Sequence, residues 1–190
     1  MKRSINLKIF SQLNNILSNI DSLILKDSNT INKFLSLIEI KMSRMNLLFR
    51  SSRDGFNYLN FVNKINNKSN LIILYLTGKD KIFGAYINIK LENINLNGSR
   101  KYYKDENAFA FSLNHNKKYK ILVPKNSIGI DSTYYILIGN SGHGNGFYYS
   151  ENTIYDKKLI NGEKIYNFEK NSELTEGSEN LLEFEIFEVI

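Results

Sequence analysis

The stretch NLIILYLTGKDKIFGAYINIKL, residues 70–91, contains two apolar segments separated by a short charged turn. Residues 70–77 are almost continuously apolar, which is typical of a β-strand that is covered on both faces. Residues 78–81, Gly-Lys-Asp-Lys, have the composition of a turn, and the apolar pattern resumes in residues 82–91. Two strands joined by so short a turn predict an antiparallel hairpin.

Further strand-like segments follow this hairpin, and few helical patterns interrupt them. In the last segment, Leu182, Phe184 and Ile186 share one face, and Glu183 and Glu185 share the other. Many short strands at close spacing predict a mostly β fold with some helices (α+β), built as a two-sheet antiparallel β-sandwich. The segments are residues 108–113, 119–123, 133–139, 146–150 and 181–190.

The residues before position 45 have a helical period instead. Residues 27–30, Asp-Ser-Asn-Thr, divide this region into two helices and offer capping side chains for the second. The two apolar stripes could pack on the protein's own sheets or on another chain, and the sequence leaves both arrangements open. The stripes consist of Leu7, Phe10, Leu13, Leu17, Ile20 and Ile24 in the first helix, and of Ile31, Phe34, Leu35 and Ile38 in the second.

Between these helices and the hairpin, residues 46–52 predict the first strand and residues 53–67 predict a further helix. Asp54 is the expected N-cap of that helix. Its expected apolar face consists of Phe56, Leu59, Val62 and Ile65.

The composition excludes several kinds of chemistry. The chain has no Cys, so it cannot form a disulfide, a thiolate metal site or a cysteine nucleophile. No apolar run approaches the roughly 18 residues that cross a membrane. His115 and His143 have no metal-ligand spacing, and no pair of carboxylates is singled out for acid–base work. We therefore expect no metal, no cofactor and no enzymatic activity.

The net charge of +6 is distributed unevenly along the chain. A nucleic-acid surface would combine basic and aromatic residues in this way, but no recognised RNA or DNA module is present. An electrostatic patch for an acidic protein partner fits better, and solvated surface lysines are the alternative. The basic residues that flank the strand 108–113 are Arg100, Lys101, Lys104, Lys117, Lys118, Lys120 and Lys125.

The glycine-rich stretch IGNSGHGNGF, residues 138–147, has the composition of a phosphate cradle or a serine nucleophile site. It matches neither the dinucleotide fingerprint, the P-loop nor the nucleophile elbow, because the required residues are displaced and a strand follows instead of a helix. The stretch therefore predicts a connection between strands whose glycines take unusual backbone angles. We expect this connection, if it has a function, to contact a partner and not to catalyse a reaction.

Five segments, in the same order along the chain, resemble the TLDc domain family. LLFRSSRDGF, residues 47–56, resembles the strand and Ser-Arg-Asp-Gly-Phe turn that open this domain. Residues 71–89 resemble its apolar strand, charged turn and Phe-Gly-Ala strand. The glycine run of the family is altered here, and a serine-rich stretch is absent from residues 151–168. The remaining similar segments are residues 106–113, 134–149 and 184–190.

The resemblance implies a β-sandwich domain over residues 44–190, preceded by a helical segment over residues 1–43. It also identifies candidate interaction residues within the matching motifs. These are Arg53, Asp54, Gly55, Phe56, Phe83, Gly84, Gly142, His143, Gly144 and Gly146.

TLDc proteins are linked to protection against oxidative stress and to binding and regulation of the vacuolar proton-translocating ATPase. The resemblance therefore implies a non-enzymatic, cytoplasmic interaction module that is recruited to acidic organelles by ATPase subunits. The alternative is a scaffold protein that its helices over residues 7–42 hold in a cytoskeletal or axonemal assembly.

Overall fold

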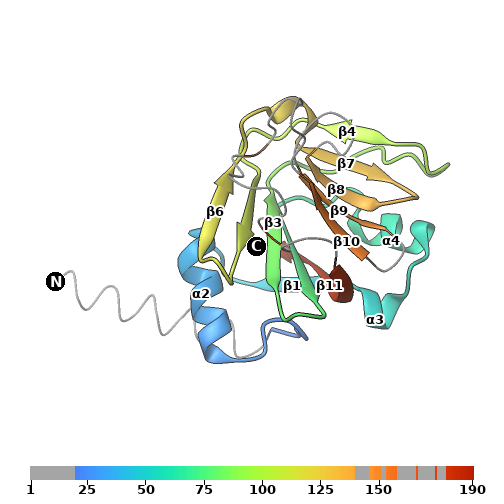
Figure 1. Ribbon diagram of the computed structural model, residues 1–190. Coiled ribbons are helices and arrows are strands. Elements are labelled where there is room, and N and C mark those ends of the chain that lie inside the picture. The colour runs from blue at the N-terminus through green and yellow to red at the C-terminus, as the bar shows by residue number, and fades with distance from the viewer. Residues whose placement is uncertain (1–19, 140–145, 151–152, 158–165, 167–173, 175–178) are drawn as a thin grey trace.

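The computed structural model describes residues 20–139, 146–150, 153–157, 166, 174 and 179–190 (Figure 1). For residues 146–150, 153–157 and 179 the backbone alone is described. Within this part of the chain the elements are, in order, α2 (Ser28–Ile38), β1 (Met45–Arg50), α3 (Ser51–Asp54), α4 (Tyr58–Ile65), β2 (Leu71–Thr77), β3 (Ile82–Ile87), β4 (Lys101–Tyr103), β5 (Phe109–Ser112), β6 (Lys117–Lys120), the 3-10 turn η1 (Pro124–Asn126), β7 (Ile128–Asp131), β8 (Tyr135–Gly139), β9 (Gly146–Ser150), β10 (Thr153–Lys157) and β11 (Glu179–Val189).

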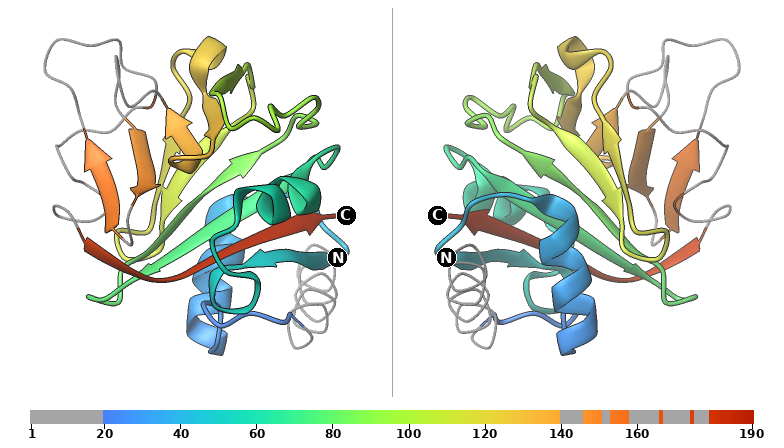
Figure 2. Two further views of the ribbon diagram at one scale, coloured as in Figure 1. Left: turned by 90° about the vertical axis from the view of Figure 1, so that its right-hand side faces the viewer. Right: turned by 90° about the vertical axis from the view of Figure 1, so that its left-hand side faces the viewer.

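The strands form two antiparallel sheets that share strand β11. The first sheet has the order β1-β11-β2-β3-β5-β6, and the second has the order β4-β7-β8-β9-β10-β11. The start of β11, at Glu179 and Asn180, pairs with β10, and the rest of the strand pairs with β2 and β1. Figure 2 shows β11 curving from one sheet into the other. This arrangement confirms the predicted mostly β, two-sheet antiparallel sandwich.

Strand β2 is buried on both faces, as its continuous apolar sequence predicts. Leu71, Ile73 and Tyr75 face the core between the two sheets. Ile72 and Leu74 face the opposite side, where they contribute to a second core. A strand in this position cannot alternate between polar and apolar residues, because neither face meets water.

The core between the sheets contains a stack of three aromatic rings. The ring of Tyr75 lies between those of Phe83 and Phe184, with centroid separations of 5.4 Å and 4.9 Å and near-parallel planes. Phe83 belongs to β3 and Phe184 to β11, so the stack connects three neighbouring strands. Burial of each ring contributes about 1.5–3 kcal/mol to the free energy of unfolding.

Helix α2 covers the outer face of the first sheet (Figure 2). It begins after Asp27, whose carboxylate accepts hydrogen bonds from the Thr30 N–H at 2.9 Å and the Thr30 hydroxyl at 2.6 Å. Phe34 is fully buried, and its ring meets that of Phe111 edge to face at a centroid separation of 6.0 Å. The predicted second helix is therefore present, and its apolar stripe packs on the protein's own sheet.

The segment that precedes α2 differs from its prediction. Residues 20–27 are not helical, so the expected helical stripe is wrong at Ile20 and Ile24, and its earlier members lie outside the described residues. Ser22 instead accepts hydrogen bonds from the backbone N–H groups of Ile24 and Leu25, at 3.1 Å and 2.8 Å. This local turn competes with helix formation, because Ser side chains bond readily to nearby backbone groups.

Helix α4 corresponds to the helix predicted over residues 53–67, but it begins later, at Tyr58. Asp54 is not its N-cap, because the carboxylate of Asp54 is already bonded to the Arg50 backbone N–H and to the side chains of Arg53 and Lys64. The N-cap is Asn57, whose side chain accepts a hydrogen bond from the Asn60 N–H at 3.0 Å.

The buried face of α4 also differs from the predicted one, and Phe56 precedes the helix. Phe56 and Leu59 were predicted on the apolar face, but their exposed fractions are 41% and 52%. The predicted members Val62 and Ile65 are buried, together with Phe61.

Three short strands were not predicted from the sequence, namely β4, β7 and β10. Each has three to five residues with only two apolar or aromatic ones, which is too few for a clear strand pattern. Leu182 in β11 is also exposed, so the prediction that it shares one face with Phe184 and Ile186, which are buried, is wrong. The pairing with β2 shifts between Leu181 and Glu183, and this irregularity turns Leu182 away from the core.

Candidate functional site

The most specific sequence motif, Arg-Asp-Gly-Phe at residues 53–56, begins in the last two residues of α3 and continues into the turn that leads to α4 (Figure 1). Before this motif, the pairing of β1 with β11 is irregular, because Leu48 has no paired residue between Leu47 and Phe49. The Leu48 carbonyl accepts a hydrogen bond from Nη2 of Arg53 at 3.2 Å. Gly55 ends α3 with φ of 68°, a backbone angle that favours glycine.

Glu183 fastens α3 to strand β11. Its carboxylate accepts hydrogen bonds from the hydroxyls of Ser51 and Ser52 and from the backbone N–H groups of Ser52 and Phe184. Burial raises the pKa of Glu183, but these hydrogen bonds outweigh the burial and lower the pKa below its ordinary value. Glu183 is therefore an ionised anchor that fixes the start of the turn.

Glu185, two residues further along β11, lies in a buried ion pair with Arg50. Nε of Arg50 is 2.8 Å from Oε1 of Glu185, and both side chains are almost completely buried. The same carboxylate accepts hydrogen bonds from the Ser22 hydroxyl at 2.6 Å and the Leu23 N–H at 2.8 Å. Nη2 of Arg50 also donates to the carbonyl and the carboxylate of Asp21. Arg50 and Glu185 thus hold residues 21–23 against the first sheet.

Asp54 receives three different donors. Arg53 donates to it from two nitrogens, at 3.0 Å and 2.8 Å, the Arg50 N–H lies at 2.9 Å, and Nζ of Lys64 lies at 3.2 Å. Burial raises the pKa of Asp54, but the hydrogen bonds from Arg53, Arg50 and Lys64 lower it to about 2. The turn is therefore held together by an ionised carboxylate at every ordinary pH.

Replacing Asp54 with Asn is expected to make the stability less dependent on pH. The folded-state pKa lies below the unfolded value of 3.8, so the stabilising contribution is complete above about pH 4 and is lost as the pH falls toward 2. At neutral pH it amounts to at most about 2 kcal/mol. Urea unfolding of both proteins from pH 7 to pH 2.5 measures this contribution. A difference in free energy of unfolding that stays constant below pH 4 would contradict the assignment.

Between Arg53 and Leu59, the end of α3, the turn and the start of α4 expose two large apolar side chains and one cation. Phe56 and Leu59 are about half exposed, and the Arg53 side chain is 43% exposed. The ring of Phe56 is fixed against that of Tyr135 in the second sheet, at a centroid separation of 5.7 Å. We name Arg53, Phe56 and Leu59 the turn surface. Half-exposed apolar residues on a rigid support, next to a cation, are typical of protein contacts.

The structure places the predicted residues Phe83 and Gly84 away from this surface. Both belong to β3, and Phe83 is completely buried in the core between the sheets. A Cβ atom on Gly84 would lie 1.9 Å from the Ile73 carbonyl oxygen. These two residues of the motif therefore serve the packing of the hairpin.

The predicted residues Gly142, His143 and Gly144 lie outside the described residues. Gly146 begins β9, and it pairs with Gly139 at the end of β8. Gly139 has φ of 91°, as a glycine-rich connection between strands requires.

The predicted basic residues lie on or next to β4 and β6, two strands at opposite ends of the strand order, with Lys125 in η1. Beside β4, Nε of Arg100 is 2.6 Å from a carboxylate oxygen of Asp131. On β6, Nζ of Lys118 donates to the Ile38 carbonyl at 3.2 Å and lies 4.0 Å from the centroid of the Phe109 ring. These cations bind groups of the same chain, so they contribute to its packing.

The described residues include no group of three or more His, Asp or Glu side chains placed to hold a metal ion. Every helix within the described ranges is too short or too polar to cross a membrane.

The sequence prediction missed the buried polar residues beneath the turn, which are Arg50, Ser51, Glu183 and Glu185. The sequence pattern places Glu183 and Glu185 on the face opposite Phe184 and Ile186, but it does not show that this face is buried as well. The signal that could have revealed them is the presence of an Arg at the end of the first strand, since a buried acid needs a charged partner.

Comparison with protein-family models gives a match to the TLDc domain over residues 16–190. The match includes the turn surface, the hairpin of β2 and β3, and helix α2. Among curated proteins, none matches the chain.

Proposed function

The chain belongs to the TLDc domain family, and from this membership we propose that it is a non-enzymatic interaction module that binds and regulates the vacuolar proton-translocating ATPase. The family is generally linked to resistance against oxidative stress. Because the chain has no Cys, thiol chemistry cannot supply such protection, which would then run through a partner protein.

The observation that carries the proposal is the turn surface on its rigid support. The carboxylate of Asp54 binds the side chain of Arg53. Glu183 binds Ser52, and Glu185 binds Arg50, so the residues before Arg53 are held in place as well. A partner that binds there therefore meets a preorganised surface and loses little conformational entropy of this chain on binding.

The alternative of a scaffold held by its N-terminal helices has less support. Phe34 and Ile38, the two buried residues of α2, pack against the protein's own sheet. This stripe is therefore not available to a filament or an axoneme.

Affinity purification of the tagged full chain from its source cells tests the proposal. We expect ATPase subunits to be recovered, and Leu59→Ser to reduce their recovery about tenfold, as is usual for an apolar anchor in an interface. Leu122→Ser is the matched control, because Leu122 is exposed to a similar extent, 50% against 52%.

Absence of ATPase subunits from gently purified samples would contradict the proposal as a whole. Equal recovery with Leu59→Ser and Leu122→Ser would contradict the role of the turn surface alone. Both variants are expected to unfold at the temperature of the original chain, since each changes an exposed side chain.

A further inference from the structure

Tyr135, the first residue of β8, has an unusual backbone next to the turn surface. Its φ is 57°, and a positive φ is a genuine outlier for a residue with a bulky side chain. Tyr135 pairs with Asp131, so β7 and β8 form a tight hairpin with residues 132–134 as its loop. Tight hairpin loops often need one residue with positive φ, and glycine usually supplies it. The hairpin therefore holds a tyrosine in a strained backbone conformation.

The hairpin loop before Tyr135 is held by the carboxylate of Asp131. Its Oδ1 accepts hydrogen bonds from the Thr133 N–H at 2.9 Å and the Tyr134 N–H at 2.7 Å. Its Oδ2 lies 2.6 Å from Nε of Arg100. A strained backbone angle persists only where the surrounding structure maintains it, and these contacts do so from the side of the loop.

The ring of Tyr135 contacts three aromatic rings of the turn and of α4. Its centroid lies 5.7 Å from that of Phe56, 6.2 Å from that of Tyr58 and 5.1 Å from that of Phe61, each time edge to face. Aromatic pairs favour this arrangement. Phe61 is completely buried, whereas Phe56 is 41% exposed. The ring of Tyr135 therefore connects the core between the sheets with the turn surface.

These contacts give a physical reason for a tyrosine where the backbone favours glycine. A glycine in place of Tyr135 would adopt the positive φ without strain, but it would remove the ring that packs against Phe56. Phe56 follows Gly55 and precedes α4, so the regular hydrogen bonds of a helix do not fix it. The contact with Tyr135 supplies this support from the second sheet.

We propose that Tyr135 is the positioning residue of the turn surface, whose ring fixes Phe56 and the backbone of residues 55–57 in the orientation that a partner meets. Only 8% of Tyr135 is exposed, so it acts through Phe56 and not by touching the partner. A surface that is fixed in advance loses less conformational entropy on binding. The inference rests on the proposed function, because it names the residue that prepares the same surface for its partner.

The first test measures backbone order parameters of residues 55–57 in the full chain by magnetic relaxation. We expect values of about 0.85, typical of a rigid backbone, in the original chain and in Tyr135→Phe, which keeps the ring. In Tyr135→Leu, which keeps an apolar side chain but has no ring, we expect values below about 0.6. The ring is thus expected to be required and the hydroxyl to be dispensable.

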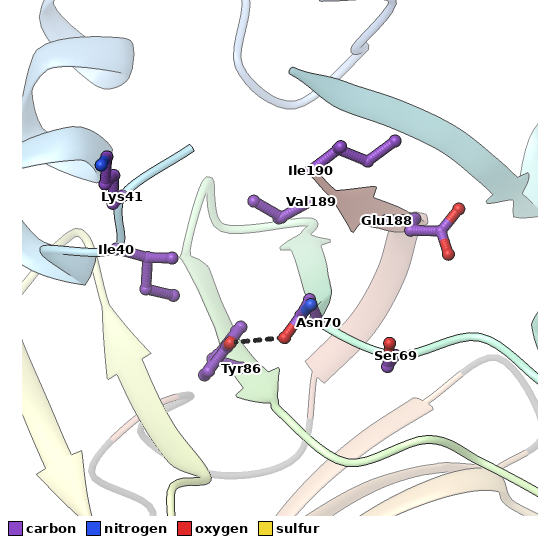
Figure 3. Close-up of a pocket in the computed structure, with 8 residues that line it drawn as sticks. All are labelled: Ile40, Lys41, Ser69, Asn70, Tyr86, Glu188, Val189 and Ile190. Atoms are coloured by element: carbon purple, nitrogen blue, oxygen red, sulfur yellow. Dashed lines mark hydrogen bonds between the residues drawn. The ribbon is translucent and has the colours of Figure 1, made fainter. Parts of the chain in front are cut away.

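Tyr86→Leu is the matched control, because Tyr86 is buried to almost the same extent, 7% exposed against 8% for Tyr135. Tyr86 belongs to the second core, and its hydroxyl bonds to Asn70 in the pocket at the end of β11 (Figure 3). Both variants lose a buried ring, but Tyr86→Leu is expected to leave residues 55–57 rigid.

Phe56→Leu removes the same ring contact from the side of the turn. Because Phe56 is exposed, this variant is expected to fold, and it is also expected to lower the order parameters of residues 55–57 below about 0.6. It decides the question if Tyr135→Leu does not fold.

The second test is the recovery of ATPase subunits in the purification described above. Tyr135→Leu is expected to reduce the recovery about fivefold relative to Tyr86→Leu, and Tyr135→Phe is expected to preserve it. A purely structural role of Tyr135 would lower the recovery equally in the two Leu variants, since each loses a buried ring.

Three results would overturn the inference. They are rigid residues 55–57 in Tyr135→Leu or Phe56→Leu, equal effects of Tyr135→Leu and Tyr86→Leu on order or on recovery, and loss of order in Tyr135→Phe. The relaxation measurement contains no ATPase. Loss of order in Tyr135→Leu, together with no ATPase subunits recovered by the original chain, would therefore contradict the proposed function and leave the positioning of the turn by Tyr135 intact.

Discussion

Gly84→Ala is expected to remove about 4 kcal/mol or more from the free energy of unfolding, although it adds a single methyl group. The added Cβ would lie 1.9 Å from the Ile73 carbonyl oxygen and 2.8 Å from Cζ of Phe111. The first of these atoms belongs to the backbone of β2, so no side-chain rotation relieves the contact. Because Gly84 pairs with Leu74 on one side and Phe111 on the other, β3 would have to move away from both neighbours.

Urea unfolding and the yield of soluble protein measure this effect. Gly78→Ala is the control, because a Cβ on Gly78 meets no atom closer than 3.9 Å and its backbone has no positive φ. The control is expected to unfold within about 1 kcal/mol of the original chain. Similar free energies of unfolding for the Gly84 and Gly78 variants would show that the close approach of β2 and β3 is not as described.

Arg50→Met is expected to cost about 3–5 kcal/mol, because it leaves the carboxylate of Glu185 buried without its cation. Glu185 has no exposed surface, and only the Ser22 hydroxyl and the Leu23 N–H would remain as its partners. The double variant Arg50→Met, Glu185→Met is expected to recover most of the loss, since a buried ion pair contributes little beyond a well-packed apolar pair.

The measurement is urea unfolding at pH 7 of the original chain, both single variants and the double variant. Arg53→Met is the matched control, because Arg53 also binds a neighbouring carboxylate but is nearly half exposed. It is expected to cost about 1 kcal/mol or less. A loss below 1 kcal/mol for Arg50→Met would mean that the ion pair is not needed to hold residues 21–23 on the sheet.

The fold could be predicted where its signals are local. The hairpin of residues 71–87 follows from a continuous apolar run and a four-residue turn, and helix α2 follows from its capping Asp27. The candidate site depends on contacts between distant residues, and its main ion pair joins positions 135 residues apart. Arg50 at the end of the first strand indicates that a buried acid could be nearby, but the sequence does not show which Glu it pairs with, because a Glu in an alternating strand usually faces water.

The exposed residues of the site show a second limit of the sequence pattern. Asp54 is a good N-cap by its residue type, but Arg53 and Lys64 compete for its carboxylate. Helix α4 therefore starts at Tyr58, and Phe56 and Leu59 are left on the surface. The motif residues Phe83 and Gly84 could be recognised as special, but only the three-dimensional contacts show that they serve packing.

The place of β11 between β1 and β2 has a consequence for synthesis on the ribosome. Residues 179–189 leave the exit tunnel well after the rest of the described sheet, yet they fill its interior. Until then β2, an apolar strand with no charged residue, has an open edge that other nascent chains can pair with. We therefore expect this protein to depend on chaperones that bind it during translation, and a nascent chain stalled before residue 179 to be more prone to aggregation than the full chain.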